Sequence, residues 1–362
     1  MKRIVLSIKR IKSTVRAVCL LGCAVLSAVP SRAQQDSPLS ANFDLPLLIN
    51  PARCGLNGEA LHDYASIHSA NLNYKSQMNG MFANYAIRVL SASYNILLLD
   101  RTMAAGIEIY TNTLNNAATS DFSANLTYAY HWNLSKEDQS GEAQHRLSFG
   151  LQAGFRRWAI NLDRLQTGSM YDPAYSGGIN PSLAPIYDFE ELSRTVFDIQ
   201  VGAHYTGWLN PNLNVQGGVS AYHLNRAKTG LGYVTSRTPV RFNVYGGASW
   251  RNTEVPAASV RHGGGLEIDF SQAAHEVSGT VTYINQDYYN MLEIAAMYRL
   301  YLCGDFSVGA GLAYRTLSQA NVFSPMLSAD IDSFTINIQC DFNCGTGGAF
   351  TNMFAIGLAY RL

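Results

Sequence analysis

The last ten residues of the chain constrain its fold more than any other stretch. Large apolar side chains alternate there with small or charged ones, and the alternation runs to the C-terminus. The large residues are Phe354, Ile356, Leu358, Tyr360 and Leu362. A period of two is typical of a β-strand with one apolar face, and a strand of about ten residues can cross a bilayer at a tilt. We therefore expect the C-terminal segment to be a membrane-spanning strand.

The same alternation recurs upstream, in segments bounded by turn-forming residues. The most regular segments are 121–133, 145–157, 290–300, 305–315 and 333–342. Less regular candidates are 65–76, 81–96, 103–111, 195–208, 212–224, 240–250, 262–271 and 275–284. With the C-terminal strand they make about fourteen, and an even number places both termini on the periplasmic side.

Composition favours a barrel in a membrane over a soluble sheet. Charged residues are 14% of the chain, against about 25% in ordinary proteins. A soluble β-sandwich also alternates, but its outward face carries many Lys and Glu, and these strands do not. In lipid an open sheet edge leaves backbone groups unpaired, and closure removes the edge. The sequence thus predicts an all-β, transmembrane, antiparallel up-and-down β-barrel of about 14 strands. The formal net charge is zero, and no basic patch indicates nucleic acid.

The N-terminus is typical of a secretory signal peptide. A basic leader precedes an apolar stretch over 17–29, and Ser31-Arg32-Ala33 offers a cleavage site after Ala33. An alternative is a lipoprotein signal, since Leu20-Leu21-Gly22-Cys23 resembles a lipobox. We therefore divide the chain into a cleaved signal peptide (1–33), a periplasmic or lumen-plugging N-terminal segment (34–64) and a barrel (65–362), and we expect it in the outer membrane, with outer-membrane lipid around it.

The lengths of the connections set the expected orientation. The longest interruption, 158–194, is rich in Asp, Pro, Gly and Ser, whereas 207–212 is a tight Asn-Pro-Asn turn. Counting back from a periplasmic C-terminus places the former outside the cell and the latter inside, which agrees with long outer loops and short inner turns. The link 316–332 does not agree, because it is long yet falls inside.

No constellation in the sequence indicates catalysis, a metal or a cofactor. There is no Gly-x-Ser-x-Gly elbow, and the eight His residues are scattered. The spacing of Cys340 and Cys344 is not backed by a second pair or a nearby His, so a zinc site is rejected. An outer-membrane lipase or protease is kept as a third class, to be recognised by activity lost on one Ser or His substitution.

Cysteines in an exported protein favour a disulfide. Cys303 lies in the turn between two regular strands, and Cys344 lies one hairpin further on. Under the fourteen-strand count both lie on the extracellular rim. We therefore predict a bond between Cys303 and either Cys344 or Cys340, with free thiols as the alternative.

Several motifs, in order, resemble one family. The segment 45–55 contains Asn50-Pro51-Ala52 followed by Gly55, and it is similar to the "N-P-A-x-x-G" that precedes the first strand in the PorP/SprF family of Bacteroidota outer-membrane proteins. Segment 71–78 resembles the "Y-R-N-Q-W" strand of that family, with Lys, Ser and Met as replacements. The strands at 126–130 and 147–154 match its paired motifs, and Asp172-Pro173 matches an Asp-Pro in its long loop. The family's His-Glu before the last strand is missing here.

The resemblance implies a non-catalytic part of the type IX secretion system, with gliding motility in some species. Such a protein would hold or pass a secreted adhesin, through the adhesin's C-terminal domain, or link to the periplasmic ring. It implies Asn50, Pro51, Asp172 and Pro173 as candidate partner contacts; alternatively Pro51 fixes the entry into the first strand. The rival function is a passive or substrate-specific porin.

Overall fold

The structure is a computed structural model, and it describes fifteen stretches of the chain. They are 45–56, 68–77, 87–98, 101–114, 118–135, 145–165, 168–175, 180, 182–183, 192–230, 236–252, 273–303, 306–317, 321–344 and 353–361. The signal peptide, the lipobox cysteine and the strand expected at 262–271 lie outside these residues. Within them no helix is long and apolar enough to cross a membrane.

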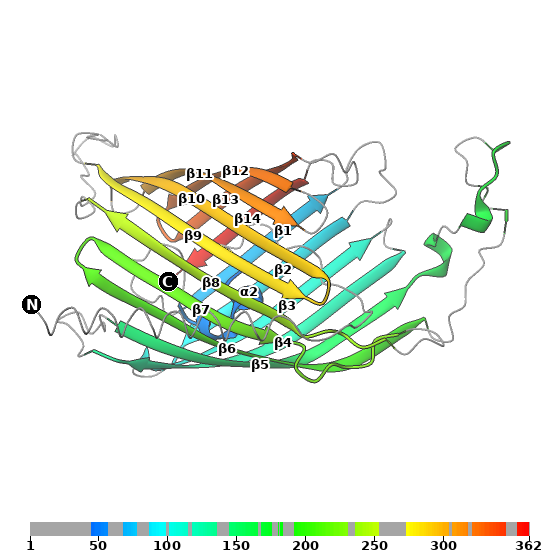
Figure 1. The fold of residues 1–362 in the computed structure, drawn as a ribbon, viewed down its shortest axis with the longest axis horizontal. Coiled ribbons are helices and arrows are strands. Elements are labelled where there is room, and N and C mark those ends of the chain that lie inside the picture. The colour runs from blue at the N-terminus through cyan, green and yellow to red at the C-terminus, as the bar shows by residue number, and fades with distance from the viewer. Residues whose placement is uncertain are drawn as a thin grey trace, which may run out of the picture. The chain divides into compact units, whose positions relative to one another are not determined.

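Fourteen antiparallel strands form a closed barrel in which each strand pairs with its neighbours in sequence (Figure 1). The strands are β1 (His68–Gln77), β2 (Ile87–Leu97), β3 (Met103–Leu114), β4 (Thr119–Asn133), β5 (His145–Ile160), β6 (Ser193–Asn210), β7 (Leu213–Tyr222), β8 (Arg241–Arg251), β9 (Ala274–Gln286), β10 (Tyr289–Cys303), β11 (Phe306–Leu317), β12 (Asn321–Ile331), β13 (Phe334–Asn343) and β14 (Met353–Arg361). The barrel closes where β1 pairs with β14, for example at Leu72 opposite Leu358. The predicted fold class is confirmed.

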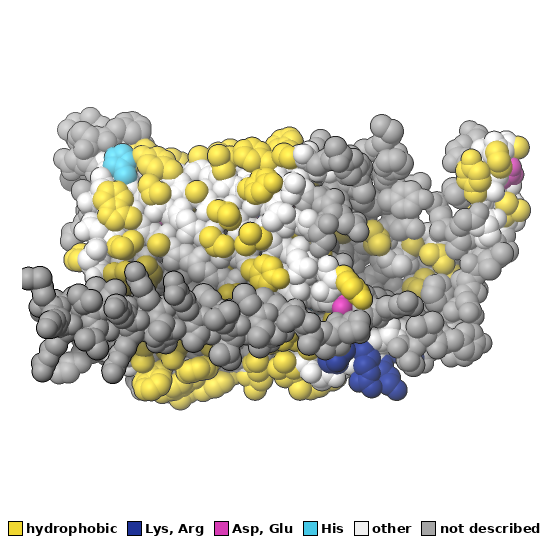
Figure 2. Space-filling model, in the orientation of Figure 1, with side chains coloured by type: hydrophobic (Ala, Val, Ile, Leu, Met, Phe, Trp, Pro, Cys, Tyr) yellow, Lys and Arg dark blue, Asp and Glu magenta, His cyan; other side chains and the backbone are white. Residues whose placement is uncertain are grey.

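Successive side chains of a strand point to opposite faces, so the period-two pattern places one set toward lipid and the other toward the lumen. Outward residues such as Leu126 and Leu327 are 67% and 60% exposed, and hydrophobic side chains are distributed over the described part of the face seen in Figure 2. Their neighbours along the strands, among them Ser148, Gln152 and Glu108, are buried and polar. This arrangement, apolar outside and polar inside, is that of an outer-membrane barrel.

The number of strands is as predicted, but the set differs at one place. Residues 321–331 form β12, whereas we expected a long link there. Pro325 lies mid-strand and lacks an N–H, which argues against a strand from sequence. The ladder from β11 runs through Pro325 opposite Leu312, while the β12–β13 ladder has no pairs at Ser324 and Pro325. The closed barrel accommodates the proline by an interruption on one side.

The additional strand changes the expected orientation of its neighbours. β10 is an even-numbered strand, so its C-terminal end lies at the rim where β1 begins and β14 ends, which we call the rim of the termini. The long link between β5 and β6, residues 161–192, lies at the opposite rim, as expected for an extracellular loop. Most of the link 316–332 is a strand, and the long connection at the rim of the termini is instead the one between β8 and β9, residues 252–273.

Candidate functional site

Residues 45–56, the plug segment, lie inside the lumen. They fold into α2 (Pro46–Ile49) and a short 3₁₀ helix, η2 (Pro51–Arg53). Each begins with a proline, whose fixed φ and missing N–H suit the first position of a helix. Between them the Asn50 Oδ1 accepts a hydrogen bond from the Ala52 N–H at 2.9 Å and caps η2. The Asn-Pro-Ala motif is therefore a compact turn, and Figure 1 shows α2 among the strands.

Two glycines form the floor on which this turn lies. Gly150 on β5 and Gly202 on β6 are paired directly across the sheet. A Cβ at Gly202 would lie 1.9 Å from the Asn50 Oδ1, and one at Gly150 would lie 2.2 Å from the Ala52 nitrogen. Contacts this short are impossible for a real side chain, so this part of the wall must be glycine for the backbone of the plug segment to approach it.

Side chains of β7 and β8 hold the plug segment by its carbonyl oxygens. Four of them donate: Ser220 Oγ to Ile49 O at 2.6 Å, Tyr222 OH to Leu47 O at 2.5 Å, Arg241 to Leu48 O at 2.9 Å and Asn243 Nδ2 to Ile49 O at 2.8 Å. In return the Asn50 Nδ2 donates to the carbonyls of Ala203 and Val219, at 2.9 and 3.2 Å. These contacts satisfy carbonyls at the end of α2 that would otherwise lack partners.

Apolar contacts also hold the plug segment, and together with the two glycines and the four donors they form what we call its seat. Leu47 and Cys54 pack with Leu97, Ala104 and Ala129 of the wall, and Leu45 and Ile49 pack with Ile284 and Met291. The Cys54 thiol donates to the Asn95 Oδ1 at 3.4 Å. Burial raises the pKa of Cys54 to about 12, so at neutral pH it is an unreactive thiol.

Ion pairs brace other parts of the lumen wall. Arg315 on β11 contacts Glu293 on β10 and, at 2.7 Å, Asp341 on β13. Arg251 on β8 pairs with Glu276 on β9 at 2.9 Å. These charges are buried and paired across strands, so they neutralise one another within the wall rather than present isolated charges to the lumen.

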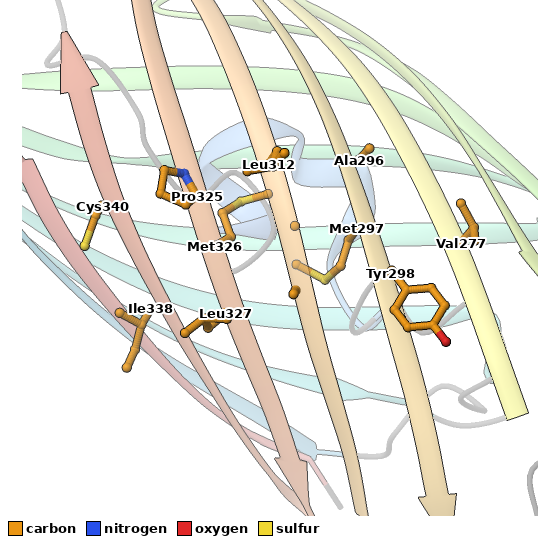
Figure 3. A pocket seen from close by; sticks show the side chains of 12 residues that line it. Val277, Ala296, Met297, Tyr298, Leu312, Pro325, Met326, Leu327, Ile338 and Cys340 are labelled. Carbon is orange, nitrogen blue, oxygen red and sulfur yellow. The ribbon is translucent and has the colours of Figure 1, made fainter. Parts of the chain in front are cut away.

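An apolar pocket of about 650 Å³ lies in the wall around β10–β13 (Figure 3). Small residues such as Ala296, Ala310 and Gly311 make room for it, and Pro325 and Cys340 line it where the β12–β13 ladder is interrupted. Met297 and Met326, which belong to an apolar cluster of the wall, lie at its base. Leu312 and Leu327, which also line it, face outward and are 52% and 60% exposed, so the pocket is a depression in the lipid-facing surface.

The structure brings two of the four predicted contact residues into one site. Asn50 is fully buried and Pro51 is buried beside it, so both contact the wall of their own barrel. Asp172 and Pro173 lie in the loop after β5, where Asp172 accepts hydrogen bonds from the Ala174 N–H and the Asn180 side chain. A contact of any of the four with another protein stays a prediction.

Cys303 and Cys344 do not share a rim, although the predicted disulfide assumed that they do. Cys303 ends β10 at the rim of the termini, whereas Cys344 follows β13 at the opposite rim, so about 30 Å of strand separates the two levels. Cys340 and Cys344 are free thiols, and the side chain of Cys303 lies outside the described part. The error came from counting 262–271 in place of 321–331.

Sequence reasoning missed the glycine floor and the four donors. Gly150 and Gly202 read as ordinary small lumen-facing positions, and their distance in sequence from Asn50 hides the contact. The available signal was the pairing of two lumen-facing glycines on neighbouring strands, which leaves space for another backbone to approach.

The fold and its occupied lumen define an outer-membrane β-barrel with an internal plug segment. The chain belongs to the family described as type IX secretion system membrane protein PorP/SprF, whose family model matches residues 31–360. The search of curated proteins gave no match.

Solved structures with a similar fold are outer-membrane barrels. A Pseudomonas aeruginosa FadL homologue is 10% identical, with 86% of this chain and 98% of that chain covered and a TM-score of 0.43. The Acinetobacter baumannii outer membrane protein Omp33 is 8% identical, with 82% and 98% covered and a TM-score of 0.38. At these values the likeness concerns the fold alone.

Proposed function

We propose that this chain is a non-catalytic component of the type IX secretion system that holds a partner at the outer membrane. The partner is the C-terminal domain of a secreted adhesin or a protein of the periplasmic ring. The observation that supports holding over conduction is the plug segment, which lies in the lumen on a floor shaped for its backbone. A lumen that contains its own chain is a poor conduit for another chain.

Two surfaces remain available to such a partner. One is the outer loop after β5, where Pro173 is exposed. The other is the rim of the termini, where β1 begins. The first would suit an adhesin outside the cell, and the second would suit a ring protein in the periplasm.

Crosslinking in native membranes, read by mass spectrometry, tests the proposal. Recovery of a very large adhesin, or of periplasmic ring lipoproteins, supports it and selects between the branches. Conductance of the pure protein in planar bilayers is the second measurement, and we expect it to be nearly silent. Large, steady channels together with no crosslinked secretion component would refute the proposal and favour the porin.

A further inference from the structure

Three His–Tyr pairs repeat along one rim of the barrel. The distances from histidine Nδ1 to tyrosine hydroxyl are 2.7 Å for His68 and Tyr94, 2.8 Å for His145 and Tyr205, and 2.6 Å for His275 and Tyr298. We refer to them as the rim pairs. None of them contributes to the plug segment or to its seat.

The rim pairs share one geometry. In each, the histidine lies at the start of a strand, and the tyrosine on the next strand faces the residue two positions further along. The facing residues are Ala70 for Tyr94, Leu147 for Tyr205 and Val277 for Tyr298. Ring centroids are 6.0–6.2 Å apart in all three. The histidines belong to β1, β5 and β9, so the arrangement recurs every fourth strand.

All three pairs lie on the lipid-facing side of the same rim. Their positions alternate with lumen-facing ones and are in phase with outward residues such as Leu72, Leu151 and Val277. β1, β5 and β9 begin at the rim of the termini, which is the periplasmic rim in a bacterial barrel with an even number of strands. The other histidines in the described residues, at 131, 204 and 223, are buried. Figure 2 shows a histidine, in cyan, at the left-hand end of the barrel beside hydrophobic side chains.

Gly207 leaves space in the wall for the contact between His145 and Tyr205. Gly207 lies directly opposite His145. A Cβ there would lie 2.5 Å from the His145 Nδ1 and 2.5 Å from the Tyr205 hydroxyl. The space for this contact therefore depends on a missing side chain.

The tautomer of the ring decides what the other ring nitrogen presents. When the tyrosine O–H donates to Nδ1 of the neutral ring, the proton lies on Nε2; in the charged ring Nδ1–H donates to the tyrosine oxygen and Nε2 is also protonated. In these two states Nε2–H is a donor held at the membrane–water interface, and the proposal below uses them. Acceptors at that depth are the phosphate and ester oxygens of lipid headgroups, and a charged phosphate oxygen is the stronger of the two.

We propose that the rim pairs are three binding sites for phospholipid headgroups of the periplasmic leaflet. Each histidine Nε2–H donates to a phosphate oxygen, and its tyrosine holds the ring in that orientation. The sites fix the depth of the barrel at three points around its circumference. This inference does not depend on the secretion partner and is tested separately from it.

Native mass spectrometry of the full barrel, released from bilayers of phosphatidylglycerol, measures the retained lipids. We expect the wild type to keep up to three more phospholipids than the His68→Leu/His145→Leu/His275→Leu variant, and each single substitution to lose one. Bilayers of monogalactosyl diacylglycerol, which has ester oxygens and no phosphate, should leave few lipids on either protein. Equal retention of the galactolipid would overturn the assignment to phosphate.

Two further variants separate the site from the fold. Gly207→Ala disturbs the His145–Tyr205 contact without removing either residue, and it should lose one phospholipid. Tyr314→Phe changes an outward tyrosine near the opposite rim and should lose none. The heat-modifiable gel shift of each variant reports whether the barrel has folded. If the folded triple variant keeps as many phospholipids as the wild type, the proposal is wrong.

Discussion

Placing methyl groups on the glycine floor should drive the plug segment out of the lumen. In Gly150→Ala/Gly202→Ala the new carbons would lie 2.2 Å from the Ala52 nitrogen and 1.9 Å from the Asn50 Oδ1. Neither contact can be relieved by turning a flexible side chain, because one is to backbone and the other is to a side chain held by three hydrogen bonds. The plug segment has to move as a unit.

The size of the effect follows from two opposing quantities. Overpacking costs about 1–3 kcal/mol per site, so about 2–6 kcal/mol for the pair. The six hydrogen bonds to main-chain carbonyls that hold the plug segment contribute a net of about 3–9 kcal/mol together. The two quantities are comparable, so overpacking can offset the hydrogen bonds. A cost of about 2–6 kcal/mol shifts the equilibrium between the seated and the released plug segment by about 30-fold to 10⁴-fold.

The Cys54 thiol provides the readout. It is buried, and its pKa is raised to about 12 while the plug segment is seated. Release exposes it and returns its pKa toward the ordinary value, and both changes speed alkylation by a maleimide at pH 7.5. The rate is measured by peptide mass spectrometry and divided by that of Cys344, which is an exposed free thiol.

A matched variant controls for adding a methyl group to the lumen wall. Gly309 also lies in a strand and faces the lumen, but a Cβ there would have its nearest neighbours at 3.4–3.5 Å, which is ordinary contact. Gly309→Ala should leave the rate at Cys54 unchanged. If the double variant also labels at the wild-type rate, the glycine floor does not seat the plug segment.

Three further substitutions have defined outcomes. Asn50→Ala removes the cap of η2 and both bonds to wall carbonyls, so it should weaken the seat by about 1–3 kcal/mol and raise the normalised labelling rate of Cys54 in the same assay. Arg315→Met removes the positive charge between two buried carboxylates and should lower the free energy of unfolding by about 3–5 kcal/mol, measured by urea titration of the gel shift; an unchanged midpoint would contradict the bracing role. Pro325→Val restores an N–H toward β13 and should raise the free energy of unfolding by about 0.5–1.5 kcal/mol in the same titration, whereas a lower value would show that the interruption is needed for packing.

The wall of the barrel was predictable because each strand carries its own signal. In β5, large outward residues alternate with small or polar inward ones along most of its length, and the predicted range 145–157 falls short of the observed end by three residues. The pattern failed at β12, where Pro325 opposes a strand locally while pairing with β11 still favours it. The proline does remove one hydrogen-bond donor, as the local sequence indicates, but pairing within the closed sheet outweighs this loss.

The plug could be predicted as a segment but not as a contact. Asn50-Pro51-Ala52 stands out in sequence as a motif before the first strand. Its glycine floor and the four donors are residues more than 90 positions further on, and no periodicity links a turn to the wall it lies on. The premise of the disulfide failed because sequence alone did not place every strand. Counting 262–271 as a strand and 321–331 as a link assigned Cys303, which lies between them, to the wrong rim.

Two regions of the lumen wall differ in whether their side chains depend on the plug segment for partners. On β7 and β8, the four donors Ser220, Tyr222, Arg241 and Asn243 are directed at carbonyl oxygens of the plug segment, whereas on β10–β13 Arg315 joins wall residues to one another. If the plug segment leaves, the second region keeps its partners, while each donor of the first that stays buried costs about 1–3 kcal/mol unless water or another chain replaces the carbonyl. A protein segment that displaced the plug would therefore have to present main-chain carbonyls above the two glycines. Such a seat selects a backbone conformation, a close turn without side chains toward the floor, rather than a sequence.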